Sequence, residues 1–207
     1  MSPYYFDLQM KAFKDAGYET YFVKDVPKIL SGDLKVGSRS AVLTFDDGYR
    51  DFYSIVLPIL KKYNLKASLY IIVDYIGWKD FLSKEEIQHI IDSKLVEIGS
   101  HTLDHVYLKN MKKEIAMHQI TESKKQLEEM FHIPVETFAY PFGAFTEESI
   151  ELVKGATYSA AVSVIPGRTQ SSDNLFYMSR LRAGNLIPAI LDKQLQEWEK
   201  YFPKEWK

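Results

Sequence analysis

The sequence predicts an α/β fold in which parallel strands alternate with helices. Short apolar runs, typical of buried strands, alternate with segments whose apolar residues recur every three or four positions, as on one face of a helix. No repeat, low-complexity tract or Pro/Gly-rich linker interrupts this order. Such alternation is typical of parallel strands joined by crossover helices, in an open sheet or in a barrel.

The first half of the chain contains the clearest helix of the sequence. The apolar residues from Phe52 to Tyr63 fall at three- and four-residue steps, which indicates one buried helix face over residues 51–63. Gly17 is expected to end an earlier helix. The expected elements are, in order, helix 6–16, strand 18–23, small helix 26–30, strand 41–45, helix 51–63 and strand 69–73.

The second half continues the alternation. Ser83 and Glu86 have the spacing of a capping box, so a helix is expected to begin there and to end near Asp92. The later elements expected are strand 96–98, helix 112–131, strand 137–140, helix 147–154 and strand 158–164. An aromatic tail with Trp198 and Trp206 is expected to form a helix that packs on the domain.

Length and composition limit the classes of protein that this chain can belong to. Its 207 residues can bury the core of one domain, so we expect a single domain over 1–207. A net charge of -2 supplies no cationic field for nucleic acid. The absence of cysteine excludes disulfides and a thiol nucleophile and leaves the compartment open. No segment has the length of a membrane span, and residues 1–6 do not resemble a signal peptide.

Three segments place polar or sterically unusual residues directly after expected strands. They are residues 44–49 (Thr-Phe-Asp-Asp-Gly-Tyr), 99–105 (Gly-Ser-His-Thr-Leu-Asp-His) and 138–143 (Phe-Ala-Tyr-Pro-Phe-Gly). Taken singly, each has an ordinary explanation: a capped turn, two surface histidines, and a turn fixed by proline and glycine. Together they carry more weight, because the loops after parallel strands build the functional site in both candidate architectures.

The side chains of these segments suit a catalytic metal. One carboxylate and two neutral imidazoles form a ligand set typical of catalytic zinc, with positions left for water and substrate. The second carboxylate of the Asp46-Asp47 pair could accept the proton of an attacking water. The same ligand set also accepts cobalt, nickel or iron.

With these three motifs in order, residues 6–182 resemble the polysaccharide deacetylase family, carbohydrate esterase family 4, whose domain is called the NodB homology domain. The resemblance implies a distorted (β/α) barrel, with Asp46 as catalytic base and Asp47, His101 and His105 as ligands of a divalent metal, Zn²⁺ in the first instance. It also implies that the backbone N–H of Phe142 stabilises the oxyanion and that Thr102 steadies the histidine loop. An N-acetylated glycan would be the substrate, and an extracytoplasmic or cell-surface location is expected.

Two positions depart from the family pattern. Many members have arginine where this chain has Ala139, and the sequence around it resembles the branch that acts on poly-β-1,6-N-acetylglucosamine. Arg180 or Arg182 could replace that arginine and support the base, although both could also be solvated charges at a strand edge.

The second departure is the missing histidine that usually acts as general acid. No histidine follows His132 or precedes Asp46, and in the permuted branch a Tyr-His segment lies just before the point where this chain begins. We therefore expect a truncated form with a metal site and weak hydrolysis, and His132 would be the first alternative acid.

The expected function is metal-dependent removal of N-acetyl groups from a glucosamine-containing polysaccharide, with poly-β-1,6-N-acetylglucosamine as one candidate. A non-catalytic glycan-binding homologue that retains the metal site is the first alternative. A metal-dependent amidase with a closed pocket for a small substrate is the second. The sequence does not determine the oligomeric state.

Overall fold

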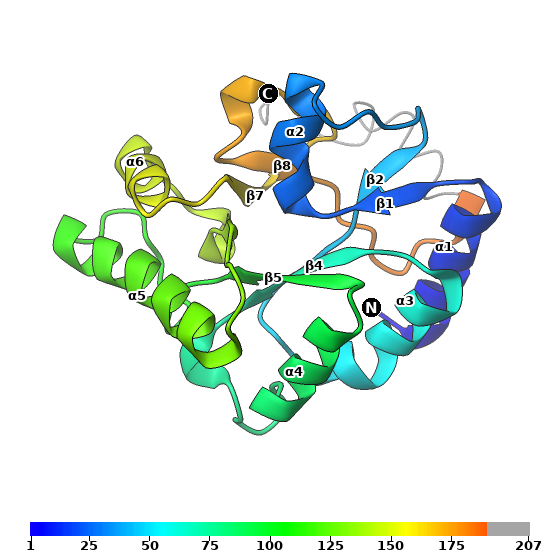
Figure 1. The fold of residues 1–207 in the computed structure, drawn as a ribbon, viewed down its shortest axis with the longest axis horizontal. Helices are drawn as coiled ribbons and strands as arrows, with labels where there is room; N and C mark the ends of the chain where they lie inside the picture. Colours follow the sequence, from blue (N-terminus) through cyan, green and yellow to red (C-terminus); the bar gives the residue numbers. More distant parts are fainter. Residues whose placement is uncertain (190–207) are drawn as a thin grey trace.

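A computed structural model describes residues 1–189 and confirms the predicted α/β fold. Six parallel strands form one curled sheet in the order β3-β4-β5-β6-β7-β8, and β1 and β2 form a separate parallel pair (Figure 1). The strands are β1 (Glu19–Tyr21), β2 (Ser40–Val42), β3 (Thr44–Phe45), β4 (Ala67–Ile71), β5 (Val96–Ser100), β6 (Thr137–Ala139), β7 (Ala160–Pro166) and β8 (Met178–Arg180).

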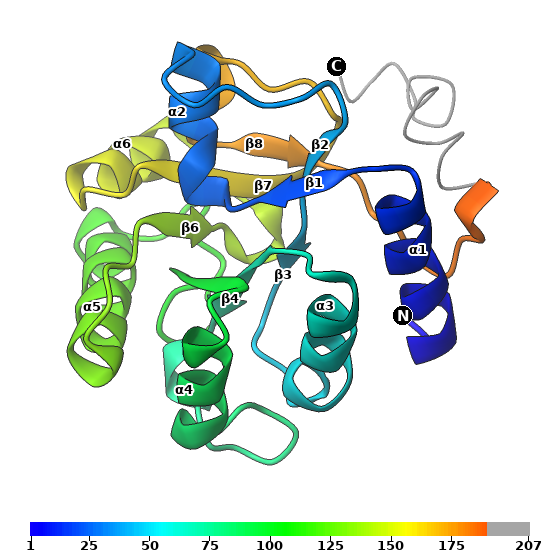
Figure 2. The same ribbon diagram turned by 45° about the vertical axis from the view of Figure 1, so that its right-hand side comes forward.

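The helices lie around the outside of the curled sheet (Figure 2). They are α1 (Pro3–Asp15), α2 (Val26–Ser31), α3 (Leu57–Tyr63), α4 (Lys84–Asp92), α5 (Lys113–Phe131) and α6 (Glu147–Gly155). Helix α3 packs on α1 and α5 packs on α6. No helix of residues 1–189 has the length and apolar character needed to cross a lipid bilayer.

Alternate residues of each strand face opposite sides of the sheet. On β4, Leu69 and Ile71 belong to the main core beneath the helices, whereas Tyr70 belongs to a second cluster in the lumen of the curled sheet. Gly99 on β5 makes room for this ring, because a Cβ there would lie 2.5 Å from two Tyr70 ring carbons. The strand pattern therefore produces two packed layers rather than an open pore.

The lumen also contains a buried carboxylate. Glu97 on β5 is only 7% exposed, and the Ser68 hydroxyl donates a hydrogen bond of 2.5 Å to its Oε1. The N–H of Val23 donates to Ser68 Oγ and the N–H of Lys24 donates to Glu97 Oε1, so the turn after β1 is attached to this polar layer. Burial raises the pKa of Glu97 to about 7, although these hydrogen bonds favour its charged form.

Two predicted elements differ from the structure for identifiable reasons. Residues 51–63 form a π-helix over Phe52–Val56 followed by α3, and Pro58 lies in the first turn of α3. Proline has no N–H to bond the carbonyl four residues back, so the hydrogen-bond ladder changes just before it. The expected strand 41–45 is interrupted at Leu43, which allows β2 to pair with β1 while β3 pairs with β4.

Other predictions were correct in detail. Ser83 and Glu86 form the expected capping box, with Glu86 N–H donating to Ser83 Oγ at 3.2 Å and Ser83 N–H donating to Glu86 Oε2 at 2.8 Å. The expected aromatic helix with Trp198 and Trp206 lies outside the described residues.

Candidate metal centre and catalytic residues

The predicted site residues come from loops at one edge of the sheet. Asp46 and Asp47 follow β3, His101 follows β5, and Phe142 lies in the turn after β6. Arg180 is the last residue of β8. Because all six strands are parallel, their carboxyl ends meet at the same edge. The sheet thus collects residues that are far apart in the sequence.

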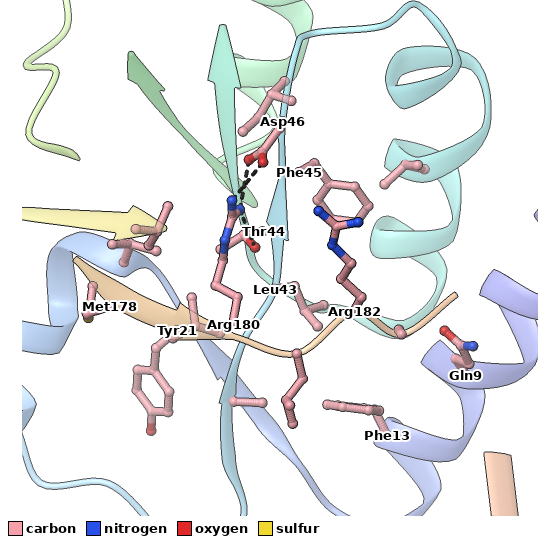
Figure 3. Close-up of a pocket in the computed structure, with 18 of the residues that line it drawn as sticks. Gln9, Phe13, Tyr21, Leu43, Thr44, Phe45, Asp46, Met178, Arg180 and Arg182 are labelled. Atoms are coloured by element: carbon pink, nitrogen blue, oxygen red, sulfur yellow. Dashed lines mark hydrogen bonds and ion pairs between the residues drawn. The ribbon is translucent and has the colours of Figure 1, made fainter. Parts of the chain in front are cut away.

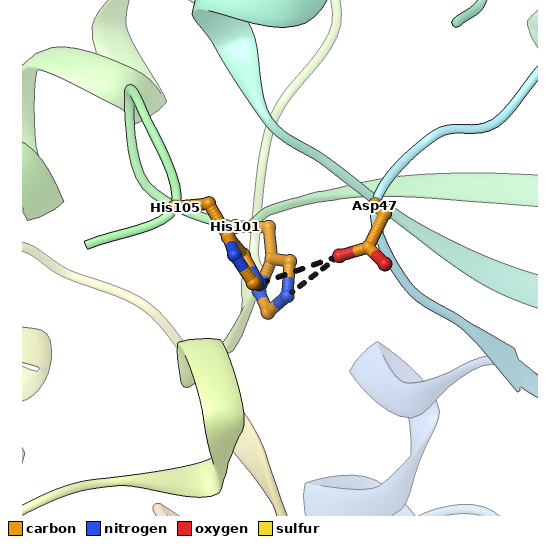
Figure 4. Close-up of side chains that lie close together, drawn as sticks. All are labelled: Asp47, His101 and His105. Atoms are coloured by element: carbon orange, nitrogen blue, oxygen red, sulfur yellow. Dashed lines mark ion pairs between the residues drawn. The ribbon is translucent and has the colours of Figure 1, made fainter. Parts of the chain in front are cut away.

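Asp47, His101 and His105 form a compact cluster (Figure 4). Both histidine Nε2 atoms lie 3.4 Å from Asp47 Oδ1, and the three candidate ligand atoms all lie within 4.8 Å of one another. Two imidazole nitrogens and one carboxylate oxygen at this spacing fit a divalent metal and leave positions for other ligands. This is the set that the sequence predicted.

A hydrogen bond orients the imidazole of His101, and burial affects the charge of His105. His101 is 2% exposed, and its Nδ1 lies 2.7 Å from the carbonyl oxygen of Ala139. A carbonyl only accepts, so Nδ1 carries the proton and Nε2 presents its lone pair to the cluster. Burial and the nearby His101 lower the pKa of His105, which favours the neutral imidazole that a metal requires.

Two hydrogen bonds fix the loop between His101 and His105, one within the loop and one from helix α5. Thr102 Oγ1 accepts a hydrogen bond of 3.0 Å from the N–H of His105. Gln119 on α5 is buried, and its Oε1 accepts a hydrogen bond from the N–H of Leu103. Gln119 was not predicted from the sequence, although it lies on the buried stripe of α5 with Ala116 and Ile120, where a polar residue needs a partner.

The backbone of the site is strained. Asp47, Thr102, His105 and Phe142 all have a positive φ, between 57° and 76°. Residues with a Cβ rarely adopt this left-handed conformation, and it costs about 1–3 kcal/mol each when the structure enforces it. Four such residues in the loops of one sheet edge are characteristic of a functional site.

Asp46 is held by an arginine rather than by the cluster (Figure 3). Arg180 donates two hydrogen bonds to it, from Nη1 to Oδ1 at 2.8 Å and from Nη2 to Oδ2 at 2.7 Å. Arg180 is itself anchored by the carbonyl of Ser163 on β7 and the hydroxyl of Thr44 on β3. Burial alone would raise the pKa of Asp46, but the Arg180 guanidinium holds it below its ordinary value. Asp46 is therefore ionised and its orientation is fixed.

This geometry shows which of Arg180 and Arg182 supports Asp46. Arg180 contacts Asp46, whereas Arg182 is exposed and its guanidinium is separate from the Asp46–Arg180 pair in Figure 3. Ala139 lies in the lumen cluster, where its carbonyl contacts His101. Of the two arginines, Arg180 is therefore the one that contacts Asp46.

Phe142 lies in a tight turn beside the cluster. The hydrogen bonds of this turn are donated by the N–H groups of Gly143 and Ala144, so they do not use the N–H of Phe142. Its ring is 60% exposed, and its centroid lies 4.5 Å from that of His105. Gly143 is required next to it, because a Cβ there would lie 2.7 Å from the backbone nitrogen of Val164.

A cavity of about 800 Å³ lies next to Asp46 (Figure 3). Much of its lining is apolar and comes from α1, α2, β2 and the helical segment after Asp51, and Asp46 and Arg180 contribute polar groups to it. None of the three metal-cluster residues lines it.

The other histidines of the described chain lie away from the cluster. His89 on α4 contacts the Tyr53 hydroxyl, and His118 is exposed on α5. His132 caps the C-terminus of α5, five residues before β6 begins, so it lies toward the opposite edge of the sheet. Its suggested role as an alternative acid is therefore wrong, because it cannot reach a substrate at the carboxyl ends of the strands.

The comparisons with known proteins agree with this fold. A family model described as Polysaccharide deacetylase matches residues 33–161, and the chain belongs to that family. The Bacillus subtilis (strain 168) protein YxkH, whose name places it among the polysaccharide deacetylases, is 32% identical over 177 residues, which are 86% of this chain and 63% of that protein. The poly-β-1,6-N-acetyl-D-glucosamine N-deacetylase of Staphylococcus aureus is 26% identical over 83% of this chain and 62% of its own length.

A solved structure shows the same fold. The Streptococcus pyogenes deacetylase PplD, in complex with acetate, superposes with a TM-score of 0.85 at 26% identity, covering 94% of this chain and 85% of that one. The chain spans a little over three fifths of the length of the two curated relatives named above.

Proposed function

We propose that this chain hydrolyses the acetamide groups of a glucosamine-containing polysaccharide with the help of a divalent metal held by Asp47, His101 and His105. The observation that carries the proposal is the separation of two roles in adjacent aspartates. Asp47 belongs to the cluster with both histidines, while Asp46 is clamped by Arg180 and keeps an ionised carboxylate for proton transfer.

Each residue has a defined task in this reaction. A divalent metal bound at the cluster would supply Lewis acidity toward the acetyl carbonyl and the attacking water. Asp46 accepts the proton of that water, and Arg180 keeps the carboxylate ionised and oriented. The N–H of Phe142, which its own turn does not use, donates to the developing oxyanion.

The substrate class follows from the relatives rather than from the cavity. The Staphylococcus aureus relative is named for poly-β-1,6-N-acetyl-D-glucosamine, so oligomers of that linkage are the first substrates to test. The exposed rings of Phe142 and Tyr107, 51% exposed, leave the cluster open on one side, which suits a chain better than a small enclosed molecule.

Acetate release tests the proposal directly. The protein is stripped with a chelator, reloaded with Zn²⁺, Co²⁺ or Ni²⁺, and incubated with β-1,6- and β-1,4-linked N-acetylglucosamine oligomers. We expect release only from the reloaded protein, and Asp46→Asn serves as a metal-binding but inactive control. Equal release by the stripped and reloaded protein would show that the metal has no role.

A second candidate is a glycan-binding protein that holds the metal without turning over its substrate. One observation favours it: the departing amine needs a proton, and the described histidines outside the cluster lie on or at the end of helices away from the site. Saturable binding of an oligomer by the reloaded protein, with no acetate formed over many hours, would identify this alternative.

A further inference from the structure

Four aromatic side chains form a continuous row that begins beside the metal centre. Tyr49 stacks on Phe81 with ring centroids 4.8 Å apart and planes at 26°. Phe81 meets Tyr75 edge-on at 4.9 Å, and Tyr75 stacks on Trp78 at 4.5 Å and 17°. We call these four residues the aromatic row. Stacked and edge-on pairs of this kind are the favoured arrangements of aromatic rings.

Backbone hydrogen bonds attach the aromatic row to the segment that follows Asp47. Tyr49 lies two residues after Asp47 and forms an antiparallel bridge with Phe81. Arg50 N–H donates to the carbonyl of Asp80 at 2.8 Å, and Leu82 N–H donates to that of Gly48 at 3.0 Å. The loop between β4 and α4, which carries the other three rings, is therefore held against the segment that presents the metal ligand (Figure 2).

The two end rings are covered on one face and open on the other. Phe81 covers one face of Tyr49 and Tyr75 covers one face of Trp78, yet Tyr49 remains 47% exposed and Trp78 55% exposed. Exposed aromatic surface that is held rigid beside a site is characteristic of ligand binding, because it loses little conformational freedom when a ligand arrives.

We propose that the aromatic row binds a sugar ring of the glycan at a position neighbouring the sugar whose acetyl group lies at the metal centre. This inference rests on the proposed function and extends it to the length of chain that the site recognises. A β-linked glucosamine ring with equatorial substituents has two flat C–H faces, which pack on aromatic rings while its hydroxyl groups point to the rim. The exposed carboxylates of Asp74 and Asp104 lie next to the row and can accept hydrogen bonds from those hydroxyl groups.

The charges near the row favour a glycan over a lipid surface. The segments that carry the rings hold the carboxylates of Asp51, Asp74 and Asp80 and fewer cations, Arg50 and Lys79, of which Arg50 is paired with Glu86, so they form no basic cluster. An anionic bilayer attracts basic clusters and repels such a rim. A neutral sugar polymer, or one that already carries free amines, meets no such repulsion.

The test compares binding and turnover over oligomers of increasing length. Trp78→Ala removes an outer ring, Trp78→Phe restores an aromatic face, and Tyr4→Ala removes a ring that is 67% exposed on α1 as a matched control. Calorimetry with metal-loaded Asp46→Asn protein measures the affinity for β-1,6-linked N-acetylglucosamine dimer and hexamer without hydrolysis. Acetate release by the otherwise unchanged chain gives kcat and KM.

We expect Trp78→Ala to weaken hexamer binding between about two- and tenfold and to raise KM to the same extent. Dimer binding, kcat and metal content should not change, and Trp78→Phe and Tyr4→Ala should resemble the parent. Equal affinity of Trp78→Ala and parent for the hexamer would overturn the inference, as would a Trp78-dependent binding of phosphatidylglycerol vesicles without any effect on the hexamer.

Failure of the proposed function has a different signature. If no acetate is released but Trp78→Ala still weakens hexamer binding, the aromatic row is a glycan site on a protein that does not hydrolyse its ligand. If acetate is released and Trp78→Ala acts like the parent at every length, the catalytic proposal stands and the row has no part in it.

Discussion

Arg180 and Asp46 lie 134 residues apart in the sequence and meet through two parallel hydrogen bonds of 2.7 and 2.8 Å. The arginine comes from the last strand of the sheet and the aspartate from the loop after β3. The pair therefore joins the two ends of the curled sheet at the candidate site.

This pair leads to the first prediction. Arg180→Gln should lower kcat by about a hundredfold, because a carboxylate displaced by even an ångström transfers protons poorly. Arg180→Lys should be intermediate, since it retains the charge but loses the two-pronged geometry. Arg182→Gln is the matched control, and its kcat should equal that of the parent. A larger loss in Arg182→Gln than in Arg180→Gln would reverse the assignment of the two arginines.

Metal content tests the cluster. His101→Ala and His105→Ala should each lose bound metal, as measured by elemental analysis after gel filtration, because each removes one of three protein ligands. Circular dichroism should change little, since both residues lie in loops after a strand. His118→Ala, an exposed histidine on α5, should bind as much metal as the parent. Full metal content in both cluster variants would rule out this site.

Metal content, measured together with turnover, also distinguishes the roles of Asp46 and Asp47. Asp46→Asn should retain metal and lose turnover by on the order of a hundredfold or more, as expected when a general base is removed. Asp47→Asn should lose metal affinity first, and added metal should partly restore its activity. The opposite pattern would exchange the two roles.

Glu97 makes the stability of the fold depend on pH. Its pKa is about 7 in the folded chain against an ordinary value of 4.5, so the folded state retains a proton that the unfolded state releases between these values. The contribution of Glu97 to the free energy of unfolding is fully present below pH 4.5. It decreases as the pH rises from 4.5 to 7 and does not change further above pH 7. The loss is about 3 kcal/mol in the free energy of unfolding.

Urea denaturation at half-unit steps from pH 4.5 to 8 measures this effect. The difference between the parent and Glu97→Gln should grow over that range, because glutamine does not titrate. Glu129→Gln, at an exposed position on α5, should follow the parent. Parallel profiles for the parent and Glu97→Gln would mean that the buried carboxylate does not hold its proton in the folded state.

The sequence was most informative where local chemistry and fold agree. The positions after parallel strands indicated one carboxylate of the Asp46-Asp47 pair together with His101 and His105, the family resemblance implied that it is Asp47, and the structure places these three ligand atoms within 4.8 Å of one another. Their roles remain predictions. Partners far apart in the sequence were harder to predict: the choice of Arg180 over Arg182 depends on where β8 ends, because residues two positions apart on one continuous strand would face the same side.

Two buried polar residues, Glu97 and Gln119, were not predicted from the sequence. Glu97 lies near the start of a short strand, where a carboxylate ordinarily indicates a solvated position, and only the pairing of β4 with β5 brings it to Ser68. Gln119 needed the same three-dimensional information, because its partner is the backbone of the histidine loop. The π-helix before Pro58 could have been expected from the proline alone.

The left-handed backbone at Asp47 and His105 links the geometry of the candidate metal cluster to the integrity of the whole sheet. A short peptide that copies either motif would relax to an ordinary extended or right-handed conformation, and its ligand atoms would disperse. The free energy that holds these three side chains in place is therefore supplied by strands and helices that lie outside the cluster. Transplanting the three ligands into another protein should succeed only where neighbouring parallel strands impose the same turns.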